Sequence, residues 1–294
     1  MSKINDFLII GFNRSDLLEQ QVERILTFRN TARIYICIDG PRQNNQSDGI
    51  QNEKIRTYLN KHKNNNSIKN IHFSDQNKGC RTGVLFAITW FFKQVDVGVI
   101  LEDDIEYDIR FLEFCDLNIS KIIDGDNVFA LGGSNFVPMK RNGQNLIKTH
   151  YPHIWGWATT KRCWQDFLEA SLTKTMIDNL IKKAINKISI LEFFYFNRKW
   201  RALQNNKIDT WDYLISAYCI ANNLYYLIPP KNLVKNIGFY TGVHDFKNIK
   251  NFTNSIDKDT FTNAIASAKQ SRRYEKKLIF SKYLSFIKET LGMI

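Results

Sequence analysis

Residues 97–108 read VGVILEDDIEYD, and their small and apolar side chains lead directly into Glu102, Asp103 and Asp104. The apolar run at 97–101 has the length and composition of a buried strand. Three unpaired carboxylates in a row would repel one another and raise each other's pKa values. The sequence therefore predicts that a positive group lies at the tip of this strand.

Further apolar runs predict strands at 7–11, 33–39, 68–73 and 127–133, with helices between them. Such an alternation is typical of an α/β fold with a mostly parallel sheet and helices on both faces. The carboxyl ends of parallel strands share one edge of the sheet, and ligands bind at that edge. We expect a binding site there.

Polar residues follow the first three strands, as the carboxylates follow the fourth. The segment 77–84 (NKGCRTGV) combines two cations with a glycine that lets backbone approach a ligand, and the start of a helix favours anions. Capping and turn formation would account for the same residues without a ligand. The candidate residues of the first three strand ends are Asn13, Arg14, Asp39, Lys78 and Arg81.

The second half of the chain is less regular. A Trp-rich turn at 151–164 precedes helices over about 165–222, and short strands are expected within 223–239. The interpretation is one domain over 1–259, divided into a nucleotide-binding half (about 1–133) and an acceptor half (about 134–259). A basic amphipathic tail follows at 260–294, which would either rest on an anionic membrane surface or pack as an ordinary terminal helix.

Composition limits the partners. The chain has 294 residues and a formal net charge of +12, which suits nucleic acid, an anionic membrane surface or a phosphorylated small molecule. No nucleic-acid-binding motif is present, so no nucleic-acid partner is expected. Five cysteines without a CxxC pair, no signal peptide and no apolar run of ~18 residues indicate a cytoplasmic protein.

The carboxylates at 102–104 suit Mn²⁺ or Mg²⁺, because these ions prefer oxygen ligands and accept substrate phosphates as further ligands. A solvated acidic cluster at a helix start is the alternative. A resemblance to known proteins favours the metal site over the acidic cluster. Seven segments carry it, in this order along the chain: FNRSDLLEQQVERI, IDGPR, NKGCRTGV, VILEDDIEYDIRFLEFC, HIWGWATTKRCW, TWDYLISAY and NLVKNIGF. Together they resemble bacterial GT-A-fold glycosyltransferases of the family 2-like group, over residues 7 to about 245. The opening and EDD segments are also similar to N-acetylglucosaminyltransferase I.

The resemblance implies a binding site for a nucleotide-sugar donor, with a UDP-sugar favoured. Asp104 would bind the metal ion, with His244 as a second ligand or a diphosphate contact. Asp103 would contact the ribose, or the metal through water, and Glu102 the sugar or a water. The other implied donor contacts are Asn13 and Arg14 beneath the nucleoside and phosphate, Asp39 on uracil N3–H, Lys78 and Arg81 on ribose or diphosphate, and Trp157 on the sugar.

The resemblance also implies inverting transfer to a hydroxyl of a cell-surface glycan or lipid-linked glycan, at the inner face of the cell membrane. One carboxylate must then accept the hydroxyl proton. Asp212, in TWDYLISAY, matches the family position, and Asp209 is the second candidate. N-acetylglucosaminyltransferase I has another acid where this chain has Tyr213, which leaves the assignment between the two open.

Two other functions remain open. A nucleotidyltransferase would share the sheet and the metal-binding acids, although it normally has a Gly-rich basic loop near the start that GFNRSD does not supply. A non-catalytic sugar-binding protein with a degenerate site is the second alternative.

Overall fold

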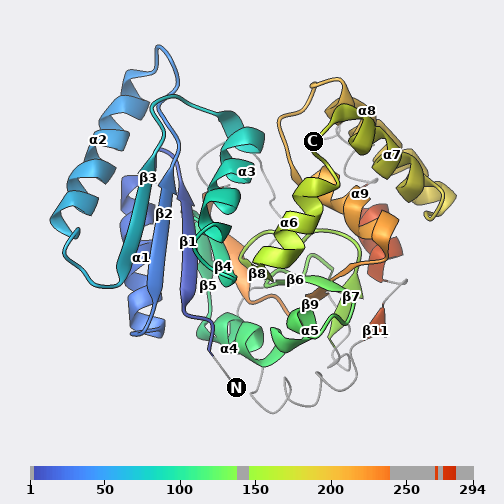
Figure 1. Cartoon of the computed structure of the whole chain (residues 1–294), viewed down its shortest axis with the longest axis horizontal. Coiled ribbons are helices and arrows are strands. Elements are labelled where there is room, and N and C mark those ends of the chain that lie inside the picture. The colour runs from blue at the N-terminus through green and yellow to red at the C-terminus, as the bar shows by residue number, and fades with distance from the viewer. Residues whose placement is uncertain (1–2, 138–145, 239–268, 271–273, 283–294) are drawn as a thin grey trace.

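The computed structural model describes residues 3–137, 146–238, 269–270 and 274–282 (Figure 1). Within them the helices are α1 (Ser15–Phe28), α2 (Gln46–Lys61), α3 (Gly79–Phe92), α4 (Ile109–Asn118), α5 (Ser120–Ile123), α6 (Lys161–Glu169), α7 (Lys174–Ile185), α8 (Ile190–Gln204) and α9 (Asp212–Asn222). The strands are β1 (Asp6–Gly11), β2 (Arg33–Ile38), β3 (Ile68–Phe73), β4 (Val97–Glu102), β5 (Ile105–Tyr107), β6 (Val128–Gly132), β7 (Ile147–Thr149), β8 (Trp157–Thr160), β9 (Tyr225–Ile228), β10 (Val234–Asn236) and β11 (Lys269–Gln270). Residues 274–282 are also helical.

One mixed sheet organises the described residues. Its strand order is β11-β7-β9-β6-β8-β4-β1-β2-β3, and β5 pairs with β10 in a separate antiparallel ribbon. The four strands β4, β1, β2 and β3 are parallel neighbours, so their carboxyl ends lie along one edge. The structure therefore confirms the expected α/β fold with a mostly parallel sheet and flanking helices.

The helices cover both faces of the sheet because the strands alternate their side chains between two cores. In β1, Phe7 and Ile9 belong to the core beneath α1, α2 and α4, whereas Leu8 belongs to the core beneath α3, α6 and α9. In β4, Val99 and Ile100 divide in the same way. Figure 1 shows α7, α8 and α9 grouped together beyond α6, at the side of the molecule away from β3.

The sequence located the first four strands within one residue and placed the helices between them correctly. The sequence predicts the second and third helices over roughly 50–62 and 83–94, and both starts are four residues too late, because α2 begins at Gln46 and α3 begins at Gly79. A further difference is β8, which lies antiparallel between β4 and β6 and separates the predicted fifth strand from the parallel group.

The described part of the predicted tail is attached to the domain. β11 pairs with β7, and the helix at 274–282 buries Tyr274, Leu278 and Ile279 in the core. Its buried Glu275 accepts a hydrogen bond from the backbone N–H of His150 at 2.7 Å. These apolar side chains are therefore covered by the protein itself. This part of the tail packs as an ordinary terminal helix, which is the second of the two expectations.

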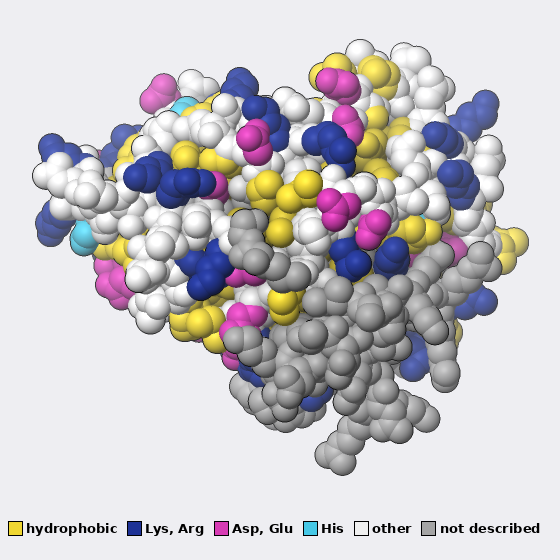
Figure 2. Space-filling model, turned by 60° about the horizontal axis from the view of Figure 1, so that its bottom comes forward, with side chains coloured by type: hydrophobic (Ala, Val, Ile, Leu, Met, Phe, Trp, Pro, Cys, Tyr) yellow, Lys and Arg dark blue, Asp and Glu magenta, His cyan; other side chains and the backbone are white. Residues whose placement is uncertain are grey.

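The positive charge on one face of the molecule is dispersed. On the face in Figure 2, Lys and Arg side chains lie in separate small groups and do not form one continuous stripe. None of the helices in the described part of the chain is both long and apolar enough to cross a membrane.

Candidate functional site

The acidic strand tip lies in a turn that β1 and α1 hold in place. The backbone N–H of Asp103 donates to the Ile10 carbonyl oxygen at 2.9 Å, which continues the pairing of β4 with β1. The buried side-chain amide of Gln21, on α1, donates to the carbonyl oxygens of Glu102 at 3.0 Å and Ile105 at 2.9 Å. Gln21 therefore fixes both ends of the turn that carries the carboxylates.

The positive group predicted at this tip is Arg14, which follows β1. Its Nη1 lies 2.8 Å from Asp103 Oδ1 and 2.8 Å from Asp104 Oδ2, so one guanidinium nitrogen bridges the two carboxylates. Asp103 also accepts the backbone N–H of Phe12 at 3.3 Å. The prediction of a cation at the strand tip is confirmed, and the protein itself provides it.

One guanidinium does not balance three carboxylates. Burial raises the pKa of Asp103 to about 6, although Arg14 opposes this shift. The pKa of Asp104 is raised by burial as well, again against the effect of Arg14. Burial and the charges of Asp104 and Asp103 raise the pKa of Glu102. Two negative charges stay unbalanced when all three carboxylates are ionised, and this edge of the sheet favours additional positive charge.

The segment 236–238 closes over Asp104. The side-chain amide of Asn236 donates to Asp104 Oδ1 at 3.4 Å, and the Ile237 N–H donates to the Asp104 carbonyl oxygen at 2.8 Å. A Cβ at Gly238 would lie 2.1 Å from Asp104 Oδ2, so only glycine permits this approach of backbone to carboxylate. The predicted second ligand, His244, lies outside the described residues.

The two candidate proton acceptors are brought to the same edge. Asp212 is the first residue of α9, and its Oδ1 accepts a hydrogen bond from the Thr210 hydroxyl. Its charge is one of those that raise the pKa of Glu102, which places the α9 start near the EDD tip. Asp209 has different partners, because its carboxylate accepts the backbone N–H groups of Cys80 at 2.8 Å and Arg81 at 3.1 Å.

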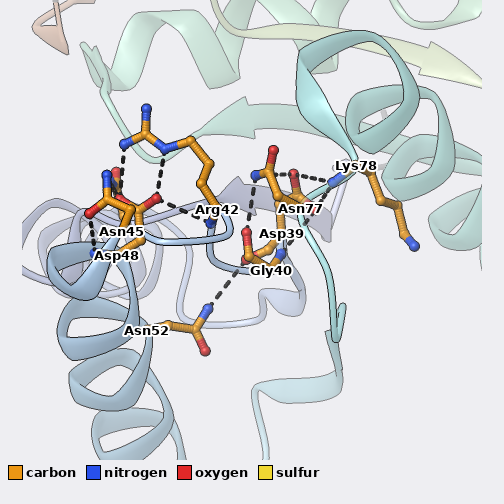
Figure 3. Close-up of polar contacts among 9 residues, drawn as sticks. Asp39, Gly40, Arg42, Asn45, Asp48, Asn52, Asn77 and Lys78 are labelled. Carbon is orange, nitrogen blue, oxygen red and sulfur yellow. Dashed lines mark hydrogen bonds and ion pairs between the residues drawn. The ribbon is translucent and has the colours of Figure 1, made fainter.

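Asp39 is engaged by its own neighbourhood (Figure 3). Its Oδ1 accepts the N–H groups of Gly40 and Lys78, both at 3.0 Å, and its Oδ2 accepts the Asn77 side-chain amide at 3.0 Å. These bonds clamp the end of β2 to the loop before α3, as a turn-forming residue would. The predicted bond to a base would have to share a carboxylate that is already saturated by donors. Lys78 directs its Nζ over the Phe86 ring, 5.2 Å from the centroid.

A second polar network in Figure 3 was missed by the sequence interpretation. Buried Asp48, in the first turn of α2, accepts from Arg42 Nε at 2.7 Å and from the Asn13 side-chain amide at 2.7 Å. Hydrogen bonds from Arg42 lower the pKa of Asp48 to about 2, against the effect of burial. Asn13 therefore binds α2 in this structure. The capping pattern of Asn45, whose side chain accepts the Asp48 N–H, was the sequence signal that could have located this helix start.

Trp157 requires a correction. The sequence placed it on the sugar, but it is 1% exposed and packs between Trp164, Trp211 and Tyr226 in the core. It pairs with Ile100 across β8 and β4, where both faces of the sheet are covered. A large apolar ring at such a position gains more from burial than from exposure at a binding edge. Trp155 is only half-buried, with its ring edge-on to Phe136 at 4.9 Å.

A hollow of about 550 Å³ lies at the opposite end of the sheet and is lined by Asp6, Arg33, Tyr35 and Asp96, among others. None of the predicted site residues lines it. Asp6 and Arg33 are paired with each other there.

The oxygen ligands at the EDD tip suit a hard divalent cation in composition and charge. Within the described residues, no three His, Cys, Asp or Glu side chains converge as a complete ligand set. Mg²⁺ commonly uses only one or two protein carboxylates and completes its shell with water and substrate phosphates. Asp104 and Glu102 fit such a partial set, and the Glu102 carboxylate has no hydrogen-bond partner among the described residues.

Comparison with known proteins found similarity among solved structures only. No protein-family model matches the chain, and no curated protein sequence is significantly similar to it. Among solved structures, the chain is similar to a crystal structure of S. aureus TarS, residues 1–349, with a TM-score of 0.39 and 12% sequence identity. The similarity covers 79% of this chain and 60% of the TarS chain, so this chain spans less than two thirds of that structure. A match of this strength does not place the chain in a family.

Proposed function

We propose that the protein is a metal-dependent glycosyltransferase that moves a sugar from a nucleotide-sugar donor to a hydroxyl group of a glycan. A UDP-sugar is the favoured donor, and a cell-surface or lipid-linked glycan the favoured acceptor, at the cytoplasmic face of the membrane. These finer assignments rest on the seven ordered segments in the sequence.

One observation carries the proposal: acids from the second half of the chain lie at the same sheet edge as the EDD tip, because Asp209 accepts N–H groups of the first turn of α3 and the segment leads directly into α9. The charge of Asp212, at the start of α9, acts on Glu102 at the tip of β4. The pKa of the Cys80 thiol, at the start of α3, is raised by burial and then by the charges of Glu102, Asp209 and Asp212. A partly neutralised acidic tip and a separate carboxylate on one edge form the pair of groups that sugar transfer requires.

The chain's own residues would divide the work. Asp104, with Glu102, would hold a divalent cation, which when bound neutralises the leaving diphosphate. Arg14 keeps the remaining carboxylate, Asp103, ionised and in place through the 2.8 Å bond to Oδ1. Asp212 would accept the proton of the attacking hydroxyl. Direct displacement by that hydroxyl inverts the configuration of the sugar carbon.

The experiment is a thermal-shift screen of UDP-, GDP-, CDP- and dTDP-sugars with and without Mn²⁺, on the wild type and three variants. A donor at 100 times its Kd stabilises the protein by about 2.7 kcal/mol. Asp104→Asn should abolish the Mn²⁺-dependent shift, whereas Asp212→Asn should keep the shift and lose transfer. Asp96→Asn is the matched control, because Asp96 precedes the same strand at the opposite edge and its side chain is 89% exposed.

A hydrolysis and pyrophosphate-exchange assay on the same panel of donors separates the alternatives. Release of free nucleoside diphosphate supports transfer, pyrophosphate exchange supports a nucleotidyltransferase, and no response to any donor supports a binding protein with a degenerate site. An unchanged Mn²⁺-dependent shift in Asp104→Asn would remove the proposed metal role.

A further inference from the structure

Asp209 links the two halves of the chain at the site. It lies in the segment between α8 and α9, yet both carboxylate oxygens accept backbone N–H groups of the first turn of α3: Oδ2 from Cys80 and Oδ1 from Arg81. The preceding residue, Gly79, has φ +75°, and a Cβ there would lie 2.7 Å from Asp209 Oδ2. The chain therefore uses glycine where the carboxylate approaches the helix end.

The geometry separates Asp209 from Asp212. Both oxygens of Asp209 are occupied by backbone N–H donors of α3, so its carboxylate is anchored to the helix end. Asp212, by contrast, accepts one hydrogen bond from the described residues: the Thr210 hydroxyl donates to one of its two carboxylate oxygens. Only two residues separate the two acids, so fixing Asp209 against α3 limits where Asp212 can lie relative to Glu102.

We propose that Asp209 is a positioning residue: its bridge to the first turn of α3 holds the start of α9 in register with β4, so that the Asp212 carboxylate faces Glu102. The inference rests on the proposed function for its catalytic consequence. The bridge itself can be tested without any sugar donor.

Cys80 is a natural reporter of the bridge. It is the exposed cysteine of the five, since Cys37, Cys115 and Cys219 are buried and Cys163 is half-buried. Partial burial, followed by the charges of Glu102, Asp209 and Asp212, raises the pKa of its thiol to about 12. Removing the Asp209 carboxylate exposes the positive end of α3 to this thiol. Each unit by which the pKa falls increases the reactive thiolate fraction about tenfold.

The first experiment measures alkylation of Cys80 by iodoacetamide between pH 7 and 10 in Asp209→Ala, Asp209→Asn and the wild type. Cys80 should react at least about threefold faster in Asp209→Ala at pH 8. Asp75→Ala is the matched control, because it removes an exposed acid from the loop before α3 without touching the bridge. Equal Cys80 rates in Asp209→Ala and wild type would overturn the bridge. Modification of the buried cysteines in Asp209→Ala would reveal that this variant is unfolded. The Cys80 rate of Asp209→Asn is then compared with that of the wild type instead.

The second experiment compares transfer kinetics. An Asn side chain keeps one acceptor oxygen for the α3 amides, so Asp209→Asn should recover most of the rate lost in Asp209→Ala and keep the wild-type pH profile. Asp212→Asn should lose transfer altogether. If Asp209→Asn is as inactive as Asp212→Asn, Asp209 is the proton acceptor and the positioning role is wrong. If the wild type transfers no sugar, the proposed function fails, while the alkylation result still decides the bridge.

Discussion

Replacing Arg14 with Met should destabilise the protein by about 2–3 kcal/mol at pH 8 in the absence of divalent metal. The guanidinium Nη1 lies 2.8 Å from both Asp103 and Asp104, and each of these residues is 5% exposed. Removing one partner of a fully buried ion pair costs about 3–5 kcal/mol, because the other charge is left in a poor solvent. The Arg14 side chain is 38% exposed, so solvent screens part of this loss, and the lower end of the range applies.

The loss should depend on pH with a definite sign. The pKa of Asp103 is about 6 with Arg14 present, above the unfolded value of about 3.9. An acid whose folded pKa lies above its unfolded pKa destabilises the fold progressively as pH rises between the two values. Without Arg14 that pKa rises further and the penalty continues to grow above pH 6. The difference between wild type and variant should therefore be small at pH 5 and complete by about pH 8.

The assay is thermal unfolding in EDTA at pH 5 and pH 8. For a chain of 294 residues the unfolding entropy corresponds to about 0.6 kcal/mol per degree, so the expected Tm decrease at pH 8 is about 3–5 °C. Arg24→Met is the control, since Arg24 lies on α1, the helix that Arg14 precedes, and is 3.5 Å from Glu106, whose side chain is 40% exposed. Such a surface pair contributes less than about 1 kcal/mol. A variant as stable as the wild type at pH 8, or equally destabilised at both pH values, would refute the reasoning.

Two further substitutions test the surroundings of the site. Gly238→Ala should cost about 1–3 kcal/mol in urea unfolding and weaken Mn²⁺-dependent donor binding, because its Cβ would lie 2.1 Å from Asp104 Oδ2; Gly49→Ala, in α2 with open space around it, should be neutral or stabilising. Asp48→Asn should lower the urea midpoint at pH 7 and leave it unchanged near pH 2. The folded pKa of Asp48 is about 2, so its ion pair with Arg42 stabilises the fold above the unfolded value of about 3.9 and is lost as pH falls toward 2. An equal effect at both pH values would show that Asp48 acts through packing instead.

The first half of the fold was predictable because its signals are local. The strands β1, β2 and β4 are short, mostly apolar runs, β3 mixes apolar and polar residues, and the helices between the strands follow directly in the chain. The antiparallel β8 was not predictable in this way. It has four residues, and its register with β4 and β6 depends on contacts made at long sequence separation. The sequence of 157–160 is equally compatible with the end of a turn.

The residue types of the site were predictable, but the partners of each carboxylate were not. Asp39 follows its strand as expected, but its oxygens bind a loop almost forty residues away. Asp209 caps a helix that begins 130 residues earlier. Whether a carboxylate accepts hydrogen bonds from the protein itself depends on which N–H groups, distant in the sequence, the fold brings close to it. Trp157 was misplaced for a related reason, since a sequence does not distinguish an aromatic ring in a core from one at a binding edge.

These partners also decide what the remaining acids can do. Asp39 and Asp209 accept backbone N–H groups and Asp48 pairs with Arg42, so these three side chains are fixed in place and shape the edge. Among the residues that the structure describes, Glu102 and Asp104 share Arg14 as a counter-charge with Asp103, and the raised pKa values of both follow from burial that this cation does not offset. A nucleoside diphosphate would be repelled from such an edge unless a cation entered with it. The proposed donor and the proposed metal ion therefore depend on each other, and diphosphate binding that is strong without any divalent cation would argue against both.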